Sequence, residues 1–183
     1  MPEHRRELER LALGAAEIDA LDRYLGLVAD WGKRVNLTGA RSPEERVAVL
    51  VAPALGLRPH LQPGGLLDVG SGNGSPGLIL GLLSPDRPVV LLEPRARRWA
   101  FLREAARQAG RPDAQILRER HDQYRGMAMP NVLLRGLRLP LAEIEPLIAA
   151  GGQALLSRSA PGTTLLEPSP GVFVYRPRVS RET

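Results

Sequence analysis

The feature that most constrains this chain is a short apolar strand that runs directly into a glycine-rich turn. Leu66–Val69 has the pattern of a buried strand, and Leu78 begins an apolar helical stretch. Between them stand Gly70, Gly72, Gly74 and Gly77. Glycines at such a turn let the backbone approach a ligand closely, and open α/β sheets bind ligands at the carboxyl ends of their strands. The stretch therefore predicts a site for a nucleotide-like ligand.

From residue 65 onward, short apolar runs alternate with helical stretches, which predicts a mostly parallel sheet with helices on both faces. The expected strands are Leu66–Val69, Val89–Leu92, Gln115–Leu117, Val132–Leu134, Ala154–Leu156 and Val172–Tyr175. Helices are expected at about 76–83, 95–109 and 140–149. The connection over 157–171 is rich in Pro, Ser and Gly, without a long helical pattern. The last strand is therefore expected to enter the sheet antiparallel.

The first 62 residues are expected to be helical and to pack on the sheet of residues 63–183 as one structural unit. Leu8 and Leu11 mark a short first helix, and an apolar stripe then recurs every three or four residues from Ile18 to Trp31. Ser42, followed by Pro43 and by Glu45 at the third position, is a helix start with a capping box. The helix that it opens is expected to run to about Leu57.

Two acidic residues narrow the class of ligand. Asp68 precedes the first glycine, where it would repel a diphosphate but would tolerate a cofactor with a positively charged amino-acid end. Glu93 ends the next strand, where a carboxylate can accept both hydroxyls of a ribose. A dinucleotide site is the alternative, because Gly72, Gly74 and Gly77 also fit that fingerprint. The early Asp68 and the longer turn containing Pro76 favour the amino-acid-bearing cofactor.

Composition bounds the remaining possibilities. The 43% apolar and 25% charged fractions are those of a globular protein. The chain has no cysteine and three scattered histidines, so we expect no metal site. It shows neither a membrane-spanning run nor a signal region, which predicts a cytoplasmic protein without a membrane partner. The formal charge of +5 rests almost wholly on arginine, which fits either a nucleic-acid partner or an arginine-rich codon usage.

Three stretches of the chain carry a family signature: WGKRVNLT at 31–38, DVGSGNGSPG within 67–77, and LLEPRARRWAFLREAARQAG at 91–110. They resemble the glucose-inhibited division protein B family, which methylates guanine in small-subunit ribosomal RNA. Together the matches run from about residue 20 to 158. The resemblance implies a Rossmann-like class I methyltransferase with a seven-stranded sheet and an N-terminal helical extension. It further implies an enzyme, expected to be a monomer, that uses S-adenosyl-L-methionine to methylate nitrogen 7 of a guanine, with ribosomal RNA or the small subunit as partner.

The resemblance also assigns roles by position. The implied cofactor-binding residues are Asp68, Gly70, Ser71, Gly72, Gly74, Glu93, Arg120 and His121. Arg135, after the fourth strand, is the expected catalytic residue beside the reacting base. Lys33, Asn36, Arg97, Arg98, Arg135 and Arg158 are the expected RNA contacts. Since nitrogen 7 has a free lone pair and no proton, the reaction requires alignment but no general base.

The chain departs from the family where substrate chemistry would lie. The family's H-x-x-D-S helix reads VLVAPALGL at 49–57, its S-R-A reads Leu134-Arg135-Gly136, and its lysine-glycine reads Arg158-Ser159. These changes leave two alternatives open: a cofactor-binding paralogue with little or no activity, and a methyltransferase acting on a small molecule.

Several of these residues also have an ordinary structural interpretation. The arginines of 95–107 can form a solvated helix face, Trp31 is expected in the core, and Asn36 and Thr38 can cap a turn. Arg135 can pair with a nearby carboxylate.

Overall fold

The computed structural model describes residues 4–160, 163–165 and 171–177 and contains a mixed α/β fold. Its helices are α1 (Arg5–Leu8), α2 (Ala15–Gly32), α3 (Pro43–Arg46), α4 (Ala52–Leu57), α5 (Gly77–Leu82), α6 (Ala96–Ala109) and α7 (Leu141–Ile144). A π-helical turn, η1 (Val47–Val51), joins α3 to α4, and 3-10 turns follow α4 (η2, Arg58–His60) and α7 (η3, Glu145–Leu147).

Seven strands of the described residues form one sheet in the order β3-β2-β1-β4-β5-β7-β6. They are β1 (Leu66–Val69), β2 (Val89–Leu92), β3 (Gln115–Leu117), β4 (Met129–Leu134), β5 (Ile148–Leu156), β6 (Thr164–Leu165) and β7 (Phe173–Tyr175). The first five run parallel, and β7 pairs antiparallel with both β5 and β6. This order places the ends of β1 and β4 side by side, so the glycine turn after Val69 lies next to Arg135.

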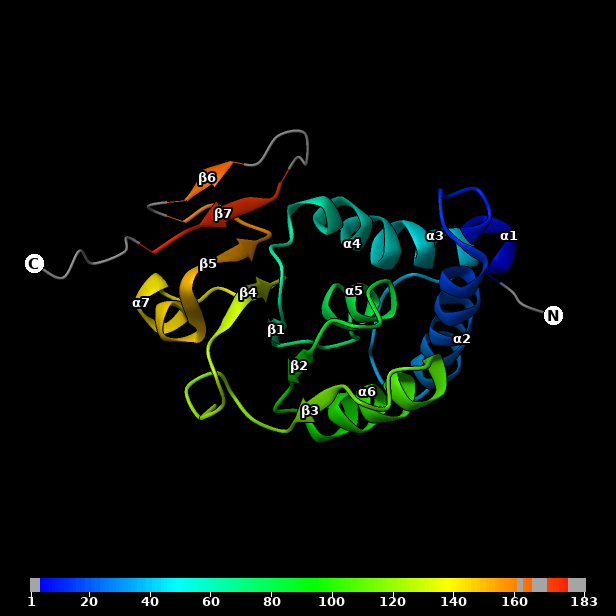
Figure 1. The fold of residues 1–183 in the computed structure, drawn as a ribbon. Coiled ribbons are helices and arrows are strands. Elements are labelled where there is room, and N and C mark those ends of the chain that lie inside the picture. The colour runs from blue at the N-terminus through cyan, green and yellow to red at the C-terminus, as the bar shows by residue number, and fades with distance from the viewer. Residues whose placement is uncertain (1–3, 161–162, 166–170, 178–183) are drawn as a thin grey trace, which may run out of the picture.

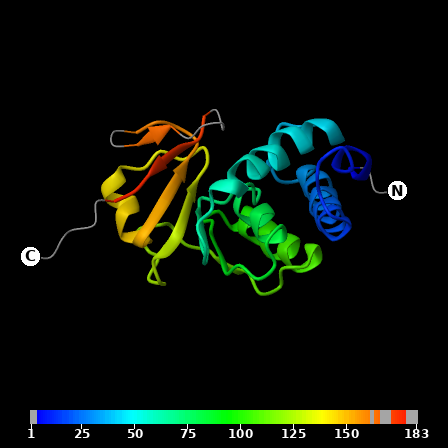
Figure 2. The same cartoon turned by 45° about the horizontal axis from the view of Figure 1, so that its top comes forward.

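Alternate residues of each strand face opposite sides of the sheet, and each side has its own apolar core. On one side, Leu66 and Leu91 pack under α2, α4, α5 and α6. On the other, Leu67 and Val90 pack with Ile144 of α7 and with Tyr124 of the β3–β4 connection. Figures 1 and 2 show the N-terminal helices and α7 on opposite sides of the sheet. The prediction of helices on both faces is therefore confirmed, although α7 is short.

The N-terminal helices share the first of these cores with the sheet. Tyr24 and Leu25 of α2 are fully buried in the same cluster as Leu78 of α5 and Phe101 of α6. Trp31 is partly buried there and meets Phe101 edge to face at 5.8 Å. Trp31 therefore packs against the edge of the core in which it was expected.

Most expected elements agree with the structure. Ser42 accepts a hydrogen bond from the Glu45 amide, and the capping box opens α3 as expected. The antiparallel entry of β7 is also confirmed. The helix expected around Leu8 ends at that residue and does not reach Leu11.

The helix expected over 140–149 is wrong in its second half. Regular helix ends at Ile144, and β5 begins at Ile148. Pro146 lacks an amide hydrogen and so cannot continue an α-helix. β4 begins at Met129, earlier than expected, and the two-residue β6 was not expected. Part of the 157–171 connection lies outside the described residues.

Candidate functional site

The glycine turn after β1 is a tight loop that backbone hydrogen bonds hold against the end of β2. The amides of Gly70 and Ser71 both donate to the Leu92 carbonyl oxygen at 2.9 Å. Gly70, Gly72 and Gly74 have φ angles of +73°, +55° and +92°. Residues other than glycine rarely adopt positive φ angles of this size. The sequence folds this way because glycine adopts these positive φ angles without a steric penalty.

Asp68 lies behind this turn. Its side chain is 1% exposed and does not line the cavity in front of the loop. One carboxylate oxygen accepts a 3.1 Å hydrogen bond from the Gly77 amide at the start of α5. Burial raises the pKa of Asp68 to about 7. The geometry makes Asp68 a support that joins the strand to the helix after the loop.

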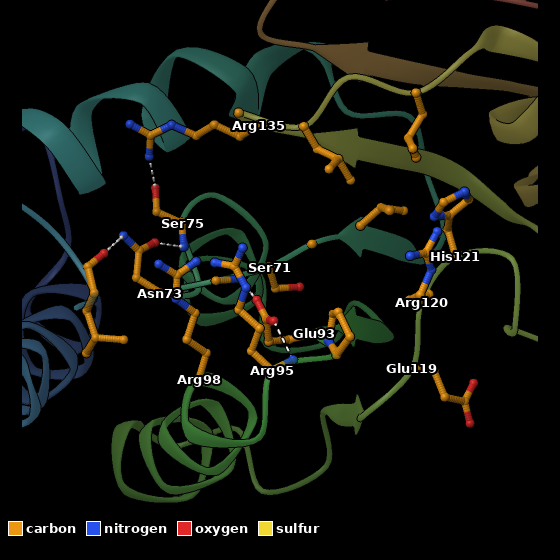
Figure 3. Close-up of a pocket in the computed structure, with 18 of the residues that line it drawn as sticks. Ser71, Asn73, Ser75, Glu93, Arg95, Arg98, Glu119, Arg120, His121 and Arg135 are labelled. Atoms are coloured by element: carbon orange, nitrogen blue, oxygen red, sulfur yellow. Dashed lines mark hydrogen bonds between the residues drawn. The ribbon is translucent and has the colours of Figure 1, made fainter. Parts of the chain in front are cut away.

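Glu93, at the end of β2, is buried, yet its carboxylate lies on the cavity wall. One oxygen accepts from the Gly72 amide at 3.0 Å and the other from the Arg95 amide at 2.8 Å. Figure 3 shows the contact with Arg95. Because a carboxylate offers about four acceptor positions, two remain for donors from a ligand.

The WGKRVNLT stretch, 31–38, closes the other side of the loop. The Asn73 side-chain amide donates to the Leu37 carbonyl oxygen at 2.9 Å, and Arg98 donates to that of Asn36 at 2.9 Å. From α2, the Tyr24 hydroxyl donates to the Asn73 carbonyl oxygen at 2.8 Å. The N-terminal helices thereby place Leu37 in the cavity wall. Thr38 caps the next turn by accepting from the Ala40 amide.

These elements enclose a cavity of about 710 Å³. Of the residues expected to bind cofactor or substrate, it brings together Gly70, Ser71, Gly72, Glu93, Arg98, Arg120, His121 and Arg135. Figure 3 shows charged side chains reaching it from the β2–α6 turn, from the segment after β3 and from the end of β4. The remaining expected residues, Asp68, Gly74, Lys33, Asn36, Arg97 and Arg158, do not line it.

Arg135 does not project freely into the cavity. Its guanidinium donates at 2.7 Å to the Ser75 hydroxyl and at 2.7 Å to the Val49 carbonyl oxygen. The Ser75 hydroxyl in turn donates to the Leu50 carbonyl oxygen at 2.7 Å. Since 49–57 contains no polar side chain, the backbone of η1 supplies these acceptors. Arg135 thus joins the end of β4 to the glycine loop and to η1 (Figure 3).

The segment after β3 forms the opposite end of the cavity. His121 is buried and its Nε2 lies 2.6 Å from a Glu143 carboxylate oxygen on α7. Arg120 is exposed and pairs with Asp122 at 3.2 Å. The His121–Glu143 contact holds this segment against α7, and Pro94 from the β2–α6 turn lines the cavity beside it. This end therefore offers a mixed apolar and polar wall.

The expected RNA contacts divide into two groups. Arg98 lines the cavity, and Arg97 is exposed on the same helix. Lys33 pairs with Asp30 at 2.9 Å, away from the cavity, and Arg158 is exposed after β5. Sequence reasoning did not select Ser75, Leu37, Val49 or Leu137. Ser75 could have been noticed because it lies within the glycine-rich stretch.

Among the described residues, no group of three or more His, Cys, Asp or Glu side chains is arranged to hold a metal ion. In the same part of the chain, no helix is both long enough and apolar enough to cross a membrane.

The strand order and the loop at the end of β1 define the class I methyltransferase fold, and solved structures share it. Geranyl diphosphate methyltransferase in complex with GPP and sinefungin aligns with a TM-score of 0.57 and 18% identity, over 78% of this chain and 65% of that one. Coclaurine N-methyltransferase bound to N-methylheliamine and SAH aligns with a TM-score of 0.54 and 16% identity, over 84% of this chain and 56% of that one. At these identities the likeness is one of fold.

Sequence comparison then gives the particular family. Residues 17–160 match the family model described as rRNA small subunit methyltransferase G, and the chain belongs to this family. The protein called ribosomal RNA small subunit methyltransferase G in Halorhodospira halophila is 32% identical to this chain, over 84% of this chain and 78% of the relative. The Chromobacterium violaceum protein of that name is 37% identical over 67% of this chain, a match spanning 60% of the relative's length. The resemblance stated from the sequence is confirmed.

Proposed function

We propose that this protein transfers a methyl group from S-adenosyl-L-methionine to nitrogen 7 of a guanine in small-subunit ribosomal RNA. Family membership supports the reaction class. The observation that supports the cofactor is the buried Glu93 carboxylate on the wall of the cavity beside the glycine loop. A charged group so deeply buried is stabilised when hydrogen-bond donors surround it, and ribose hydroxyls would complete the set begun by two backbone amides.

The residues present fit this cofactor. Glu93 would accept the ribose hydroxyls, and the segment containing Arg120 and His121, with Pro94, would hold the adenine. The exposed backbone of Gly70 and Gly72 would contact the amino-acid end. When bound, the cofactor supplies an activated methyl group on a sulfonium, so the protein needs to contribute mainly alignment and exclusion of water. Asp68 supports the loop from behind.

Arg135 can serve the acceptor side of the reaction. Two of its five N–H donors are taken by Ser75 and by Val49. The others can reach the acceptor edge of a guanine, the pairing that arginine makes with guanine elsewhere. Because nitrogen 7 carries no proton, no general base is required.

Charge around the cavity supports a polyanionic substrate. Four arginines, Arg95, Arg98, Arg120 and Arg135, line the cavity, against two carboxylates, Glu93 and Glu119. We propose that Arg95 and Arg98, with the exposed Arg97, contact RNA phosphates. A ribosomal substrate would place the protein in the cytoplasm, and the proposal takes the monomer as the acting unit.

The test is transfer of labelled methyl from S-adenosyl-L-methionine to small-subunit ribosomal RNA from a strain that lacks this protein. Label should enter one guanine, mapped by mass spectrometry, and RNA from the parent strain should take up little. A cofactor-binding protein without transfer activity is the second candidate, favoured by the absence of polar side chains from 49–57. It predicts S-adenosylhomocysteine binding by calorimetry with no incorporation into RNA or RNA-containing particles.

A further inference from the structure

Two exposed apolar side chains stand on the wall of the cavity, near Arg135. Val49 is 44% exposed and Leu137 is 37% exposed, and both line the cavity. The third large apolar side chain exposed by the described residues is Met127, at 79%, and it does not line the cavity. Apolar side chains grouped beside a polar site often mark a binding surface. The packing of the fold covers neither Val49 nor Leu137.

Both side chains are fixed relative to Arg135 and the glycine loop. The Val49 carbonyl oxygen accepts from the Arg135 guanidinium, while Leu137 follows Arg135 by two residues in the chain. Leu137 also lies over the loop, since a Cβ added at Gly70 would be 3.3 Å from its Cδ2 atom. The pair therefore stands where the glycine loop, η1 and the end of β4 meet.

The combination of groups selects one kind of ligand. Apolar side chains favour a flat ring, Arg135 retains donors for acceptor atoms at its edge, and Arg95 and Arg98 provide positive charge along the same cavity. A nucleotide in RNA has all three complementary features: a flat base, acceptor atoms on its edge and anionic phosphates. An enzyme that acts on a base commonly turns it out of the stack into such a pocket.

We propose that Val49 and Leu137 pack against the ring of a purine base turned out of the RNA and hold it beside the glycine loop. The inference rests on the proposed function and deepens it by naming the acceptor subsite. In this arrangement Arg135 has two roles. Its guanidinium holds the Val49 backbone, and its remaining donors face the edge of the base.

The binding arm of the test is methyl NMR on protein labelled at Val, Leu and Met methyl groups and saturated with S-adenosylhomocysteine. Guanosine 5′-monophosphate at millimolar concentration should shift the methyl signals of Val49 and Leu137 through the ring current of the base. The Met127 signal should stay in place, and uridine 5′-monophosphate should give smaller shifts. Spectra of the Val49→Thr and Leu137→Asn variants assign the signals.

The kinetic arm uses the same two substitutions, which keep side-chain size but remove apolar surface at exposed positions. Each should lower kcat/KM for ribosomal RNA by about tenfold or more, and this loss should exceed any change in S-adenosylhomocysteine affinity. Met127→Gln is the matched control and should retain full activity.

The outcomes separate the two proposals. Unshifted Val49 and Leu137 signals overturn the base subsite, whether or not the protein methylates RNA. Shifted signals without methyl transfer support the subsite and overturn the proposed reaction. Variants that match Met127→Gln in kcat/KM overturn the subsite even if the reaction is confirmed.

Discussion

The guanidinium of Arg135 donates a 2.7 Å hydrogen bond to the Ser75 hydroxyl, which itself donates to the Leu50 carbonyl oxygen. This relay links three segments that lie far apart in the chain: the end of β4, the glycine loop and η1. An exposed arginine beside a cavity would be free to move. Here the hydrogen bonds of the relay fix the direction of the Arg135 side chain. They thereby also fix the part of the cavity wall that Arg135 forms.

Breaking this relay should destabilise the protein. Ser75→Ala leaves the buried Leu50 carbonyl and one Arg135 donor without this partner, which should lower the free energy of unfolding by about 1–3 kcal/mol. Arg135→Lys should cost a similar amount, because one ammonium cannot reproduce both guanidinium contacts. Urea denaturation of the two single variants and the double variant measures the coupling. Strictly additive effects would show that the two side chains do not interact in solution.

Glu93→Gln should weaken S-adenosylhomocysteine binding by at least about tenfold. The carboxylate accepts from the amides of Gly72 and Arg95 through different oxygens, and an amide side chain offers one oxygen in place of two. Isothermal calorimetry measures the dissociation constant. Glu119→Gln, on the wall of the same cavity after β3, is the matched control and should change it little. Equal losses for the two variants would contradict the ribose role of Glu93.

Asp68 should make stability depend on pH. Burial raises its pKa in the folded state to about 7 from the ordinary value of 3.8. The folded protein therefore holds a proton that the unfolded chain has released, and stability falls as pH rises from about 4 through 7. The full effect amounts to about 4 kcal/mol. In Asp68→Asn, the unfolding free energy should vary less over this range. A pH profile that matches the wild type would show that Asp68 ionises normally in the fold.

Gly77→Ala should disturb the site without touching the cavity. A Cβ at this first residue of α5 would overlap the Asp68 side chain, forcing the helix and the strand apart. Overpacking of this kind typically costs about 1–3 kcal/mol, and thermal unfolding should show a lower Tm. Gly39→Ala, where a Cβ would meet nothing within 4 Å, is the control. If Gly77→Ala retains the wild-type Tm, the packing between Asp68 and α5 is looser than described.

The sequence by itself determined the elements that depend on local patterns. The bounds of β1, β2 and β3, the capping box at Ser42 and the conformation of the glycine turn follow from side-chain periodicity and turn chemistry, which act over a few residues. Glu93 could be placed near the glycines because parallel strands end at one edge of a sheet.

The tertiary structure decided what depends on contacts between distant segments. That Arg135 is bonded to Ser75 and Val49 could not be read from local patterns, because these partners lie 60 and 86 residues away. The burial of Asp68 and the meeting of Leu37, Val49 and Leu137 around one cavity likewise depend on how the elements pack. The same holds for Ile148, which pairs with Met129 of β4 where the end of a helix was expected. The periodicity of apolar residues determines which face of a segment is buried, whereas only the packed fold determines which partner each polar group contacts.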